Sequence, residues 1–366
     1  MVSVVLAGGG TAGHTSPLIA TAKAIQRLEP DVELVCIGTS RGLETRVIPA
    51  AGLELQLITA VPMPRRPNLD LVKLPWRLVR AIRESRSILT DARADVLVGF
   101  GGYVSIPAYL AARSLGVPVV VHEANQLPGL ANRIGARFAA FTAITFAETT
   151  LANSTLLGMP IARSITHPNL TSHEARELFG LAPELPVLLV SGGSQGARSL
   201  NLALESAVPE LLGAGVQVLH VLGPKNFADQ HVERADPGTG ARYVPVAFVE
   251  DMAVAYTAAD LMVARAGAAT VMETAVSGLP VIFVPLPWGN GEQAKNAAAL
   301  VAAGAGVMLP EADLSSATLA GLVIPRINDK ALLTRMSQTA RKHYPADAAD
   351  TLARAVTDVA LEKKAP

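Results

Sequence analysis

A short apolar run, a glycine loop and the start of a helix follow one another twice in this chain of 366 residues. The first copy ends in Gly9-Gly10-Thr11-Ala12-Gly13 and the second in Gly192-Gly193-Ser194-Gln195-Gly196, so both loops have the form Gly-Gly-hydroxyl-x-Gly. Short β-branched runs are typical of strands covered on both faces, and glycines let the backbone turn sharply into a helix. The repeat therefore predicts two α/β halves of similar size.

Strands and helices alternate along the rest of the chain. The expected strands cover residues 32–37, 96–100, 117–121, 216–222, 243–246, 261–264 and 281–284. Such alternation favours parallel, doubly wound sheets. We predict an α/β fold of two Rossmann-like domains that face a cleft, with residues 1–160 as the first domain and 161–345 as the second. A last helix over residues 346–364 is expected to return to the first domain.

Composition excludes several classes of protein. Lys plus Arg and Asp plus Glu are both 31, so there is no global attraction to nucleic acid. Cys36 is the only cysteine, which rules out an internal disulfide and is typical of a reducing compartment. The first residues lack the basic segment and the cleavage site of a signal peptide, so we expect none, and no apolar run reaches the roughly 18–20 residues that span a bilayer. These features predict a cytoplasmic protein, at most peripheral to a membrane.

One segment of the first half mixes basic and apolar side chains around Trp76. Its cations are Arg65, Arg66, Lys73, Arg77, Arg80, Arg83, Arg86 and Arg93. This mixture is typical of a surface that rests on anionic lipid, and equally of an amphipathic helix with a solvated arginine face. Both interpretations stay open. Pro75 predicts that the helix starts late and leaves residues 69–74 as a loop.

Polar residues of the first half gather after the expected strands, where doubly wound sheets bind ligands. His14 titrates near neutrality and is the first candidate for a general base, with Glu123 as the second. The first loop also fits the dinucleotide pattern Gly-x-Gly-x-x-Gly, although no acid for a ribose follows the second strand before Glu44. Because Arg41 can meet a 2′-phosphate, an NADP-dependent oxidoreductase is one alternative.

The second half offers groups for a sugar nucleotide. Ser194, Gln195 and the free N–H groups at the next helix start favour a diphosphate. Glu273 can accept hydrogen bonds from a ribose diol, since an ionised carboxylate offers only acceptors. Gln293 and Asn296, three residues apart, are expected on one helical face toward sugar hydroxyls. The second half therefore predicts the site of an activated donor.

The sequence contains no Asp-x-Asp pair and no His/Asp cluster at metal-ligand spacing. A leaving diphosphate would then be stabilised by helix dipoles and Arg163. We therefore expect no metal and no other cofactor.

Five motifs, in this order and spacing, resemble the MurG family of N-acetylglucosaminyltransferases. They are Gly9-Gly10-Thr11-Ala12-Gly13-His14, Gly101-Gly102-Tyr103-Val104-Ser105, His122-Glu123-x-Asn125, Gly192-Gly193-Ser194-Gln195-Gly196-Ala197 and Arg265-x-Gly267-Ala268-x-Thr270-x-x-Glu273. The resemblance covers nearly the whole chain and implies the two-domain GT-B fold. It implies an inverting transfer of N-acetylglucosamine from UDP-N-acetylglucosamine to the C4 hydroxyl of lipid-linked N-acetylmuramoyl-pentapeptide. This step converts lipid I to lipid II in peptidoglycan synthesis.

The resemblance also assigns roles to residues. The first domain would bind the acceptor and the cytoplasmic face of the cell membrane, with His14, Glu123 and Tyr103 on the acceptor side. The second would bind UDP-N-acetylglucosamine, with Val249 on the uracil, Glu273 on the ribose and Gln293 on the transferred sugar. The other donor contacts would be Thr11, Ala12, Gly13, Asn125, Arg163, Ser194, Gln195, Ala268, Ala269, Thr270, Val271 and Met272.

The sequence departs from the family at a few positions. Ala12 stands where the family has a glycine, and Met159 stands where it has an asparagine. A sugar-nucleotide epimerase on the same fold is a second alternative to the transferase, and a non-catalytic membrane scaffold is a more distant one.

Overall fold

The computed structural model describes residues 2–61, 70–193, 196–288 and 290–364. The chain divides into two compact units. Unit 1 combines Met1–Ala162 with Asp347–Pro366, and unit 2 is Arg163–Ala346. Each unit therefore has its own sheet and its own core.

Unit 1 is built on a parallel sheet of seven strands in the order β3-β2-β1-β4-β5-β6-β7. The strands are β1 (Ser3–Ala7), β2 (Glu33–Thr39), β3 (Glu54–Ile58), β4 (Val96–Gly99), β5 (Val119–Glu123), β6 (Phe141–Ile144) and β7 (Ser154–Leu156). Because β1 pairs with both β2 and β4, the strand order reverses beside β1. The carboxyl ends of strands at such a reversal are where doubly wound sheets bind ligands.

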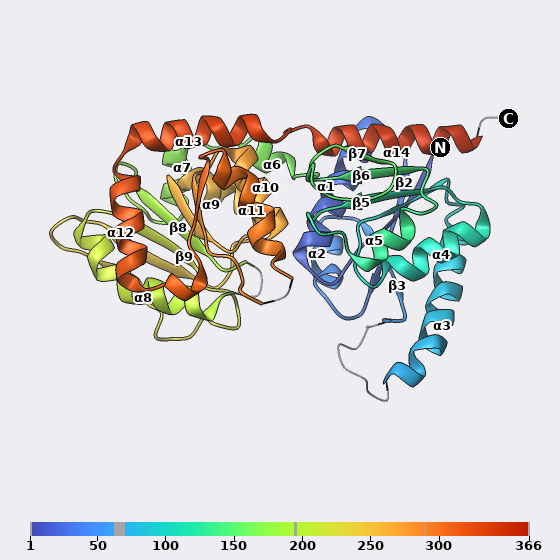
Figure 1. Ribbon diagram of the computed structural model, residues 1–366, viewed down its shortest axis with the longest axis horizontal. Helices are drawn as coiled ribbons and strands as arrows, with labels where there is room; N and C mark the ends of the chain where they lie inside the picture. Colours follow the sequence, from blue (N-terminus) through green and yellow to red (C-terminus); the bar gives the residue numbers. More distant parts are fainter. Residues whose placement is uncertain (1, 62–69, 194–195, 289, 365–366) are drawn as a thin grey trace. The chain divides into compact units, whose positions relative to one another are not determined.

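The helices of unit 1 include the last helix of the chain. They are α1 (Ala12–Leu28), α2 (Glu44–Ala50), α3 (Asp70–Asp91), α4 (Ser105–Leu115), α5 (Leu130–Gly135) and α14 (Ala348–Lys364). Helix α14 packs on α1, where Arg27 and Asp350 form an ion pair of 2.7 Å (Figure 1). Lys363 Nζ donates to the carbonyl of Ala94 at 2.8 Å. The end of the chain therefore completes the core of unit 1.

Unit 2 repeats this plan with the strand order β10-β11-β9-β8-β12-β13-β14. The strands are β8 (Val187–Ser191), β9 (Gln217–Val221), β10 (Arg234–Ala235), β11 (Arg242–Val246), β12 (Leu261–Ala264), β13 (Val281–Phe283) and β14 (Gly306–Met308). The helices are α6 (Arg163–Thr166), α7 (Ser172–Leu178), α8 (Arg198–Gly213), α9 (Met252–Ala258), α10 (Ala268–Ser277), α11 (Glu292–Ala302), α12 (Ser316–Ile327) and α13 (Lys330–His343), with the short η1 (Glu311–Asp313). Strand β10 pairs antiparallel with β11, and the other strand pairs are parallel.

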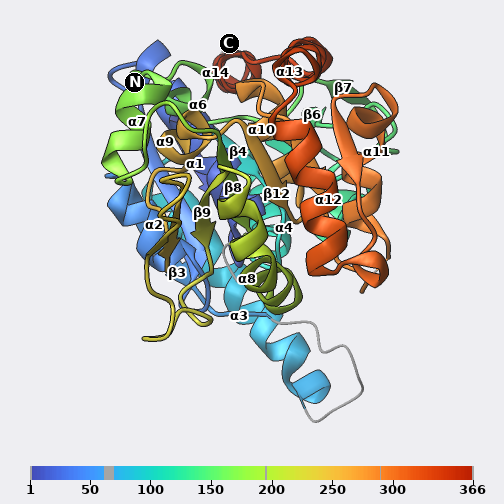
Figure 2. The ribbon, with the colours of Figure 1, turned by 90° about the vertical axis from the view of Figure 1, so that its left-hand side faces the viewer.

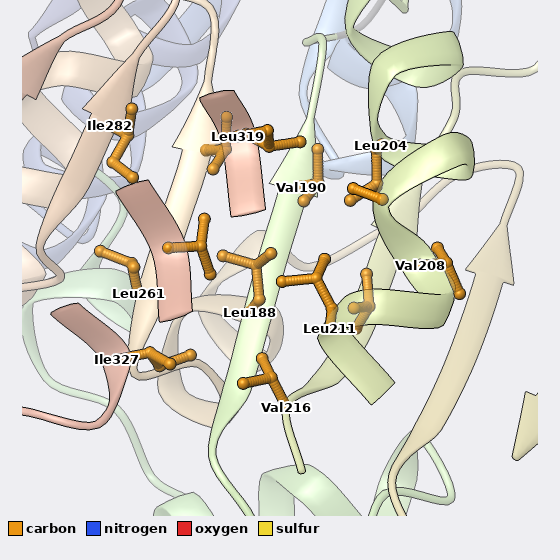
Figure 3. Close-up of a cluster of buried hydrophobic side chains, with 14 of the residues drawn as sticks. Leu188, Val190, Leu204, Val208, Leu211, Val216, Leu261, Ile282, Leu319 and Ile327 are labelled. Atoms are coloured by element: carbon orange, nitrogen blue, oxygen red, sulfur yellow. The ribbon is translucent and has the colours of Figure 1, made fainter. Parts of the chain in front are cut away.

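One face of the unit 2 sheet packs against α8 and α12 (Figures 2 and 3). Leu188 and Val190 of β8 are fully buried in this cluster with Leu204 of α8 and Leu319 of α12. Each fully buried Leu or Val side chain stabilises the fold by about 1.5–3 kcal/mol. Strand β8 is part of this core and leads directly into the second glycine loop, so core packing sets the position where the loop begins.

Helices α1 and α3 both begin before a proline of the sequence. Helix α1 begins at Ala12, with Thr11 as its N-cap, and Pro17 lies inside it. Helix α3 is already formed at Asp70, so Pro75 is internal and the predicted loop is wrong for residues 70–74. A proline removes only one backbone donor, and the long helix that follows it outweighs that loss near a helix start. Ala12 therefore occupies a helical position, where its methyl group causes no strain.

Candidate active site

The first glycine loop is held by a buried acid. Glu44 is fully buried, and one of its oxygens accepts the N–H of Gly10 at 2.8 Å. Its other oxygen accepts the N–H and the hydroxyl of Thr39, at 3.2 and 2.9 Å. A Cβ atom on Gly9 would lie 2.6 Å from this carboxylate, so any larger residue there would displace the Glu44 side chain. The loop is therefore already paired with an anion of the protein itself.

This arrangement bears on the dinucleotide alternative. The acid that the dinucleotide pattern requires after the second strand must reach a bound ribose. Glu44 instead faces the backbone of the first loop and has no exposed surface. Glu44 is therefore not placed to bind a ribose, and an NADP-dependent oxidoreductase would have to rely on Arg41 for the 2′-phosphate.

His14 lies in the first turn of α1 with one ring nitrogen committed to the loop. Its Nδ1 is 3.0 Å from the carbonyl oxygen of Gly9. Because a carbonyl only accepts, Nδ1 carries the proton and Nε2 carries the lone pair. Burial lowers the pKa of His14 below its ordinary value, and the Gly9 hydrogen bond and the Glu44 charge offset this only in part. The imidazole is therefore neutral near pH 7, the state that a general base requires.

The loop after β4 packs directly on the first loop. Gly101 and Gly102 have φ angles of 92° and 77°, which favour glycine. A Cβ atom on Gly102 would lie 2.6 Å from the carbonyl oxygen of Gly9. This close backbone contact brings Tyr103, which is 50% exposed, to the sheet edge that carries His14.

Glu123, the second candidate base, is used by its own loop. It is 2% exposed, and one oxygen accepts the N–H of Asn125 at 2.9 Å. The other oxygen accepts the N–H of Gly129 at 2.9 Å and the Asn132 side-chain amide at 3.0 Å. A general base must reach the hydroxyl that it deprotonates. Glu123 does not have this access, and it shapes the loop that carries the half-buried Asn125 instead.

The second glycine loop differs from the first in what its backbone contacts. The N–H of Gly193 donates to the neutral hydroxyl of Ser191 at 3.2 Å. Gly196 has a φ angle of 72°, and helix α8 begins at Arg198. Ser194 and Gln195, which the sequence predicted as diphosphate contacts, lie outside the described residues.

Arg265 connects the segments that surround this second loop. It is 7% exposed, and its Nη1 donates to the carbonyls of Val284 and Pro285 at 3.1 and 3.3 Å and pairs with Glu311. Its Nη2 donates to the hydroxyl of Ser199, in the first turn of α8, at 3.1 Å. The sequence placed Arg265 in a motif without giving it a role. Its contacts show a residue that fixes the start of α8 against the end of β13.

Helix α10 divides the predicted nucleoside contacts by burial. The side chains of Ala268, Val271 and Met272 are buried, whereas Ala269, Thr270 and Glu273 are half-buried. The second set is spaced as residues on one helix face are. Only this face offers side chains to a ligand, so the buried members of the predicted set belong to the core.

Glu273 has a hydrogen-bond partner that lies outside the sequence motifs. The hydroxyl of Tyr256, which lies on α9 and is 6% exposed, donates to Glu273 Oε2 at 2.8 Å. Burial raises the pKa of Glu273 to about 7, and the hydrogen bond from Tyr256 opposes this rise. Glu273 therefore changes its charge near neutrality.

The two residues of α11 that were predicted to contact the sugar differ in burial. Gln293 is half-buried, and its side-chain oxygen accepts the N–H of Leu286 at 2.9 Å. Asn296 is fully buried and donates to the carbonyl of Ala266 at 3.4 Å. The expectation that both face a sugar is therefore wrong for Asn296, because that side of the helix packs into the core.

The remaining predicted contacts lie near the start of α9. Val249 is half-buried in the loop between β11 and α9. Arg163 is exposed at the start of α6, and the hydroxyl of the next residue, Ser164, is 3.5 Å from the carboxylate of Asp251. Asp251 caps α9 by accepting the N–H of Ala253. Arg163 and Val249 thus flank one helix start.

Two further findings concern metals and membranes. Across residues 2–61, 70–193, 196–288 and 290–364, no group of three or more His, Cys, Asp or Glu side chains is placed to hold a metal ion. In the same part of the chain, no helix has the length and apolar character needed to cross a bilayer.

Helix α3 presents a mixed basic and aromatic stripe. Its N-terminal turns extend away from α4 and the sheet in both views (Figures 1 and 2). The opposite side of the helix is anchored by buried Ala81 and Leu89, whereas Trp76 is 80% exposed. We call five of its exposed residues the α3 stripe; they are Lys73, Trp76, Val79, Arg80 and Arg83. Arg65 and Arg66 lie outside the described residues.

Comparison with known proteins assigns the family. The N-terminal domain of glycosyltransferase family 28 matches residues 4–144, and the C-terminal domain of that family matches residues 187–352. Together with the two doubly wound sheets, these matches define a two-domain glycosyltransferase. A crystal structure of Acinetobacter baumannii MurG has a TM-score of 0.74 at 28% identity and covers 98% of this chain and 100% of that one.

Two relatives are similar over nearly their whole length. Each is called UDP-N-acetylglucosamine–N-acetylmuramyl-(pentapeptide) pyrophosphoryl-undecaprenol N-acetylglucosamine transferase. The one from Cutibacterium acnes is 53% identical and covers 98% of both chains. The one from a Nocardioides species is 50% identical and covers 99% of both. The chain therefore belongs to the MurG family of N-acetylglucosamine transferases.

Proposed function

We propose that this protein transfers N-acetylglucosamine from UDP-N-acetylglucosamine to the C4 hydroxyl of a lipid-linked N-acetylmuramoyl-pentapeptide, with inversion at the anomeric carbon. This reaction makes lipid II from lipid I in peptidoglycan synthesis. The observation that carries the proposal is the match to transferases of this name at about half identity over 98% or more of both chains.

The residues at the carboxyl ends of the strands support donor binding by unit 2 and acceptor binding by unit 1. In unit 2, the partly exposed face of α10 offers Glu273 to a ribose, and the N-terminus of α8 suits a diphosphate. The backbone of Val249 would meet the uracil, and Gln293 would meet the sugar. Unit 1 would bind the acceptor through the edge that carries His14 and Tyr103. The expected sugar contacts of Thr11, Ala12, Gly13 and Asn125 stay predictions.

His14 supplies the base in this proposal. Its Nε2 takes the proton of the C4 hydroxyl, and the oxygen forms a bond to the anomeric carbon. The bond from that carbon to the phosphate oxygen breaks on the opposite face, and its electron pair leaves with UDP. The positive end of the α8 dipole and the Arg163 guanidinium stabilise the charge on the leaving diphosphate.

The direct test uses the purified chain with labelled UDP-N-acetylglucosamine and a lipid I analogue, in the presence of EDTA. We expect transfer of label to the acceptor and release of UDP. Label transfer that strictly requires a divalent ion would overturn the stabilisation by α8 and Arg163. Conversion of the donor without any acceptor would support the epimerase instead, and no reaction at all would remove the enzyme proposal.

We further propose that the α3 stripe rests on the anionic surface at the cytoplasmic face of the cell membrane. An 80% exposed tryptophan among cations suits a headgroup region better than bulk water. We expect the chain to sediment with vesicles that contain anionic lipid, and less so after K73Q, R80Q and R83Q are combined. The same three changes at the exposed cations Arg335, Lys342 and Arg354 provide the control. Equal binding by both triple variants would return α3 to an ordinary amphipathic helix.

A further inference from the structure

Helix α9 links two parts of the proposed donor site. It follows the loop that carries Val249, and its N-cap is Asp251. Tyr256 lies on α9 and donates its hydroxyl to Glu273 Oε2 on α10 at 2.8 Å. One oxygen of Glu273 is therefore occupied from within the protein, while Glu273 itself stays half-buried at the sheet edge.

Building on the proposed donor site, we propose that Tyr256 is a positioning residue for UDP-N-acetylglucosamine. Its hydroxyl holds Oε2 of Glu273 and leaves Oε1 to accept hydrogen bonds from the ribose diol. Tyr256 does not need to touch the nucleotide, because it is 6% exposed and acts through the carboxylate. It also ties the helix after the uracil loop to the helix that carries the ribose acid.

Four helices of unit 2 pack against α10, namely α6, α9, α11 and α13. Their titratable or charged side chains are Arg163, Tyr256, Glu292, Lys295, Lys330, Arg335, Arg341, Lys342 and His343. Arg341 is held at the far end of α10, where it donates to the Ser277 carbonyl at 2.8 Å. The shift in the Glu273 pKa has two causes, burial and the Tyr256 hydroxyl. Tyr256 is thus the group through which the protein adjusts this carboxyl.

The sign of the expected pH dependence follows from the hydrogen bonds. A ribose diol donates, so it requires the ionised, acceptor-only form of Glu273. Burial raises the pKa of Glu273 to about 7, and affinity for the donor is therefore lost as the pH falls through that value. The Tyr256 hydroxyl favours the ionised form, so its removal raises the pKa further and moves the loss of affinity to higher pH.

The test measures binding of UDP-N-acetylglucosamine to the full chain by calorimetry, between about pH 5.5 and 8.5, a range in which the ligand does not titrate. For the wild type we expect affinity to fall about tenfold from one pH unit above the Glu273 midpoint to one unit below it. Y256F is expected to move the midpoint up by roughly one pH unit. In turnover near neutral pH, Y256F should raise KM for the donor several-fold and leave kcat and the acceptor KM nearly unchanged.

Two variants serve as references. Y243F removes another buried tyrosine hydroxyl of unit 2. That hydroxyl lies 3.0 Å from His220 Nδ1, so Y243F should keep the wild-type midpoint of the pH dependence of donor affinity. E273Q should bind the donor weakly and with little pH dependence. A Y256F midpoint equal to that of the wild type would overturn the role of Tyr256 while leaving the donor site intact. A wild type that binds no UDP-N-acetylglucosamine at any pH would overturn the proposed function as well.

A second measurement covers the case in which Y256F does not fold. Replacement of all five tyrosines by 3-fluorotyrosine keeps every hydroxyl and makes each a stronger donor. The stronger bond to Glu273 should move the affinity midpoint to lower pH. An unchanged midpoint in the fluorinated protein would contradict the proposal.

Discussion

The loops at the carboxyl ends of the strands carry similar motifs in the two units, but the acids beside these loops differ in burial and in hydrogen-bond partners. In unit 1, Glu44 and Glu123 are 0% and 2% exposed, and backbone N–H groups of the neighbouring loops donate to both. In unit 2, Glu273 is half-buried and accepts a bond from the tyrosine hydroxyl of Tyr256. In unit 1 the acids therefore hold the loops at the carboxyl ends of the strands, whereas in unit 2 the acid is partly exposed and can bind a ligand.

This difference shows what the Gly-Gly-hydroxyl-x-Gly motif does and does not determine. The motif fixes a sharp turn between a strand and a helix in both units. The charge beneath the turn comes from elsewhere: Glu44 is 34 residues away from the Gly10 N–H that it accepts. An internal carboxylate disfavours a second anion at the same loop, while the neutral Ser191 hydroxyl beneath the second loop does not. The comparison therefore supports a donor diphosphate in unit 2.

Replacement of the proposed base tests the unit 1 edge most strongly. H14A removes the nitrogen proposed to take the C4 proton, so kcat should fall by about 10²–10⁴-fold. The affinity for UDP-N-acetylglucosamine, measured by calorimetry, should stay within about twofold of the wild type, because the proposed base acts in the chemical step and not in donor binding. Because the pKa of His14 lies below its ordinary value, the wild-type kcat at saturating donor should fall only when the pH drops below the ordinary pKa of a histidine. H167A, at an exposed histidine of unit 2, is the control.

Loss of donor binding in H14A would contradict the division between the edges. A rate loss that appears equally in H167A would point to a general effect on the fold rather than to a base.

Removal of Glu44 tests whether the first loop is built around an internal anion. E44A leaves the N–H and the hydroxyl of Thr39 without their acceptor in a buried position, at a cost of about 1–3 kcal/mol for each group. We expect the unit 1 transition in urea to lose about 3 kcal/mol or more while the unit 2 transition is unchanged. E54A, at an exposed acid of β3, should change the unit 1 transition by about 0.5 kcal/mol or less. A mild effect of E44A would show that the carboxylate is dispensable and would weaken the comparison.

Much of the fold follows from local sequence. Strands such as β1 and β8 are short β-branched runs that are buried on both faces, and they were predicted because burial leaves that signature. Strands β7 and β10 have three and two residues with partly or fully exposed side chains, so they leave no comparable pattern. Helix α11 is rich in alanine and buries a polar side chain, so its sequence does not mark Asn296 as a core residue, and Asn296 was assigned to the wrong side for that reason.

The candidate site was predictable only where its residues sit in motifs. His14 and Glu273 follow glycine-rich loops, so their place at a sheet edge could be read from the strand that precedes them. Tyr256 is 17 residues from Glu273, and Arg265 is 66 residues from Ser199. Such contacts depend on how helices and strands pack across a unit, and spacing along the chain does not encode them.

The smallest expected effect concerns the contact between the two loops of unit 1. Gly102 and Gly116 both have positive φ angles, of 77° and 66°, so alanine is strained at either position. Only at Gly102 would the new Cβ atom meet backbone, 2.6 Å from the Gly9 carbonyl; at Gly116 nothing lies within 4 Å. G102A should therefore destabilise unit 1 by about 1–3 kcal/mol more than G116A, measured by urea unfolding.

G102A should also slow transfer more than G116A does, because the Gly9 carbonyl that it displaces holds His14 Nδ1. Donor affinity should differ little between the two variants, since the proposed contacts to the nucleoside and the diphosphate lie in unit 2. If G102A and G116A proved equivalent in stability and turnover, the loop after β4 would not support the base. The unit 1 edge would then have to position His14 through Glu44 and the first loop only.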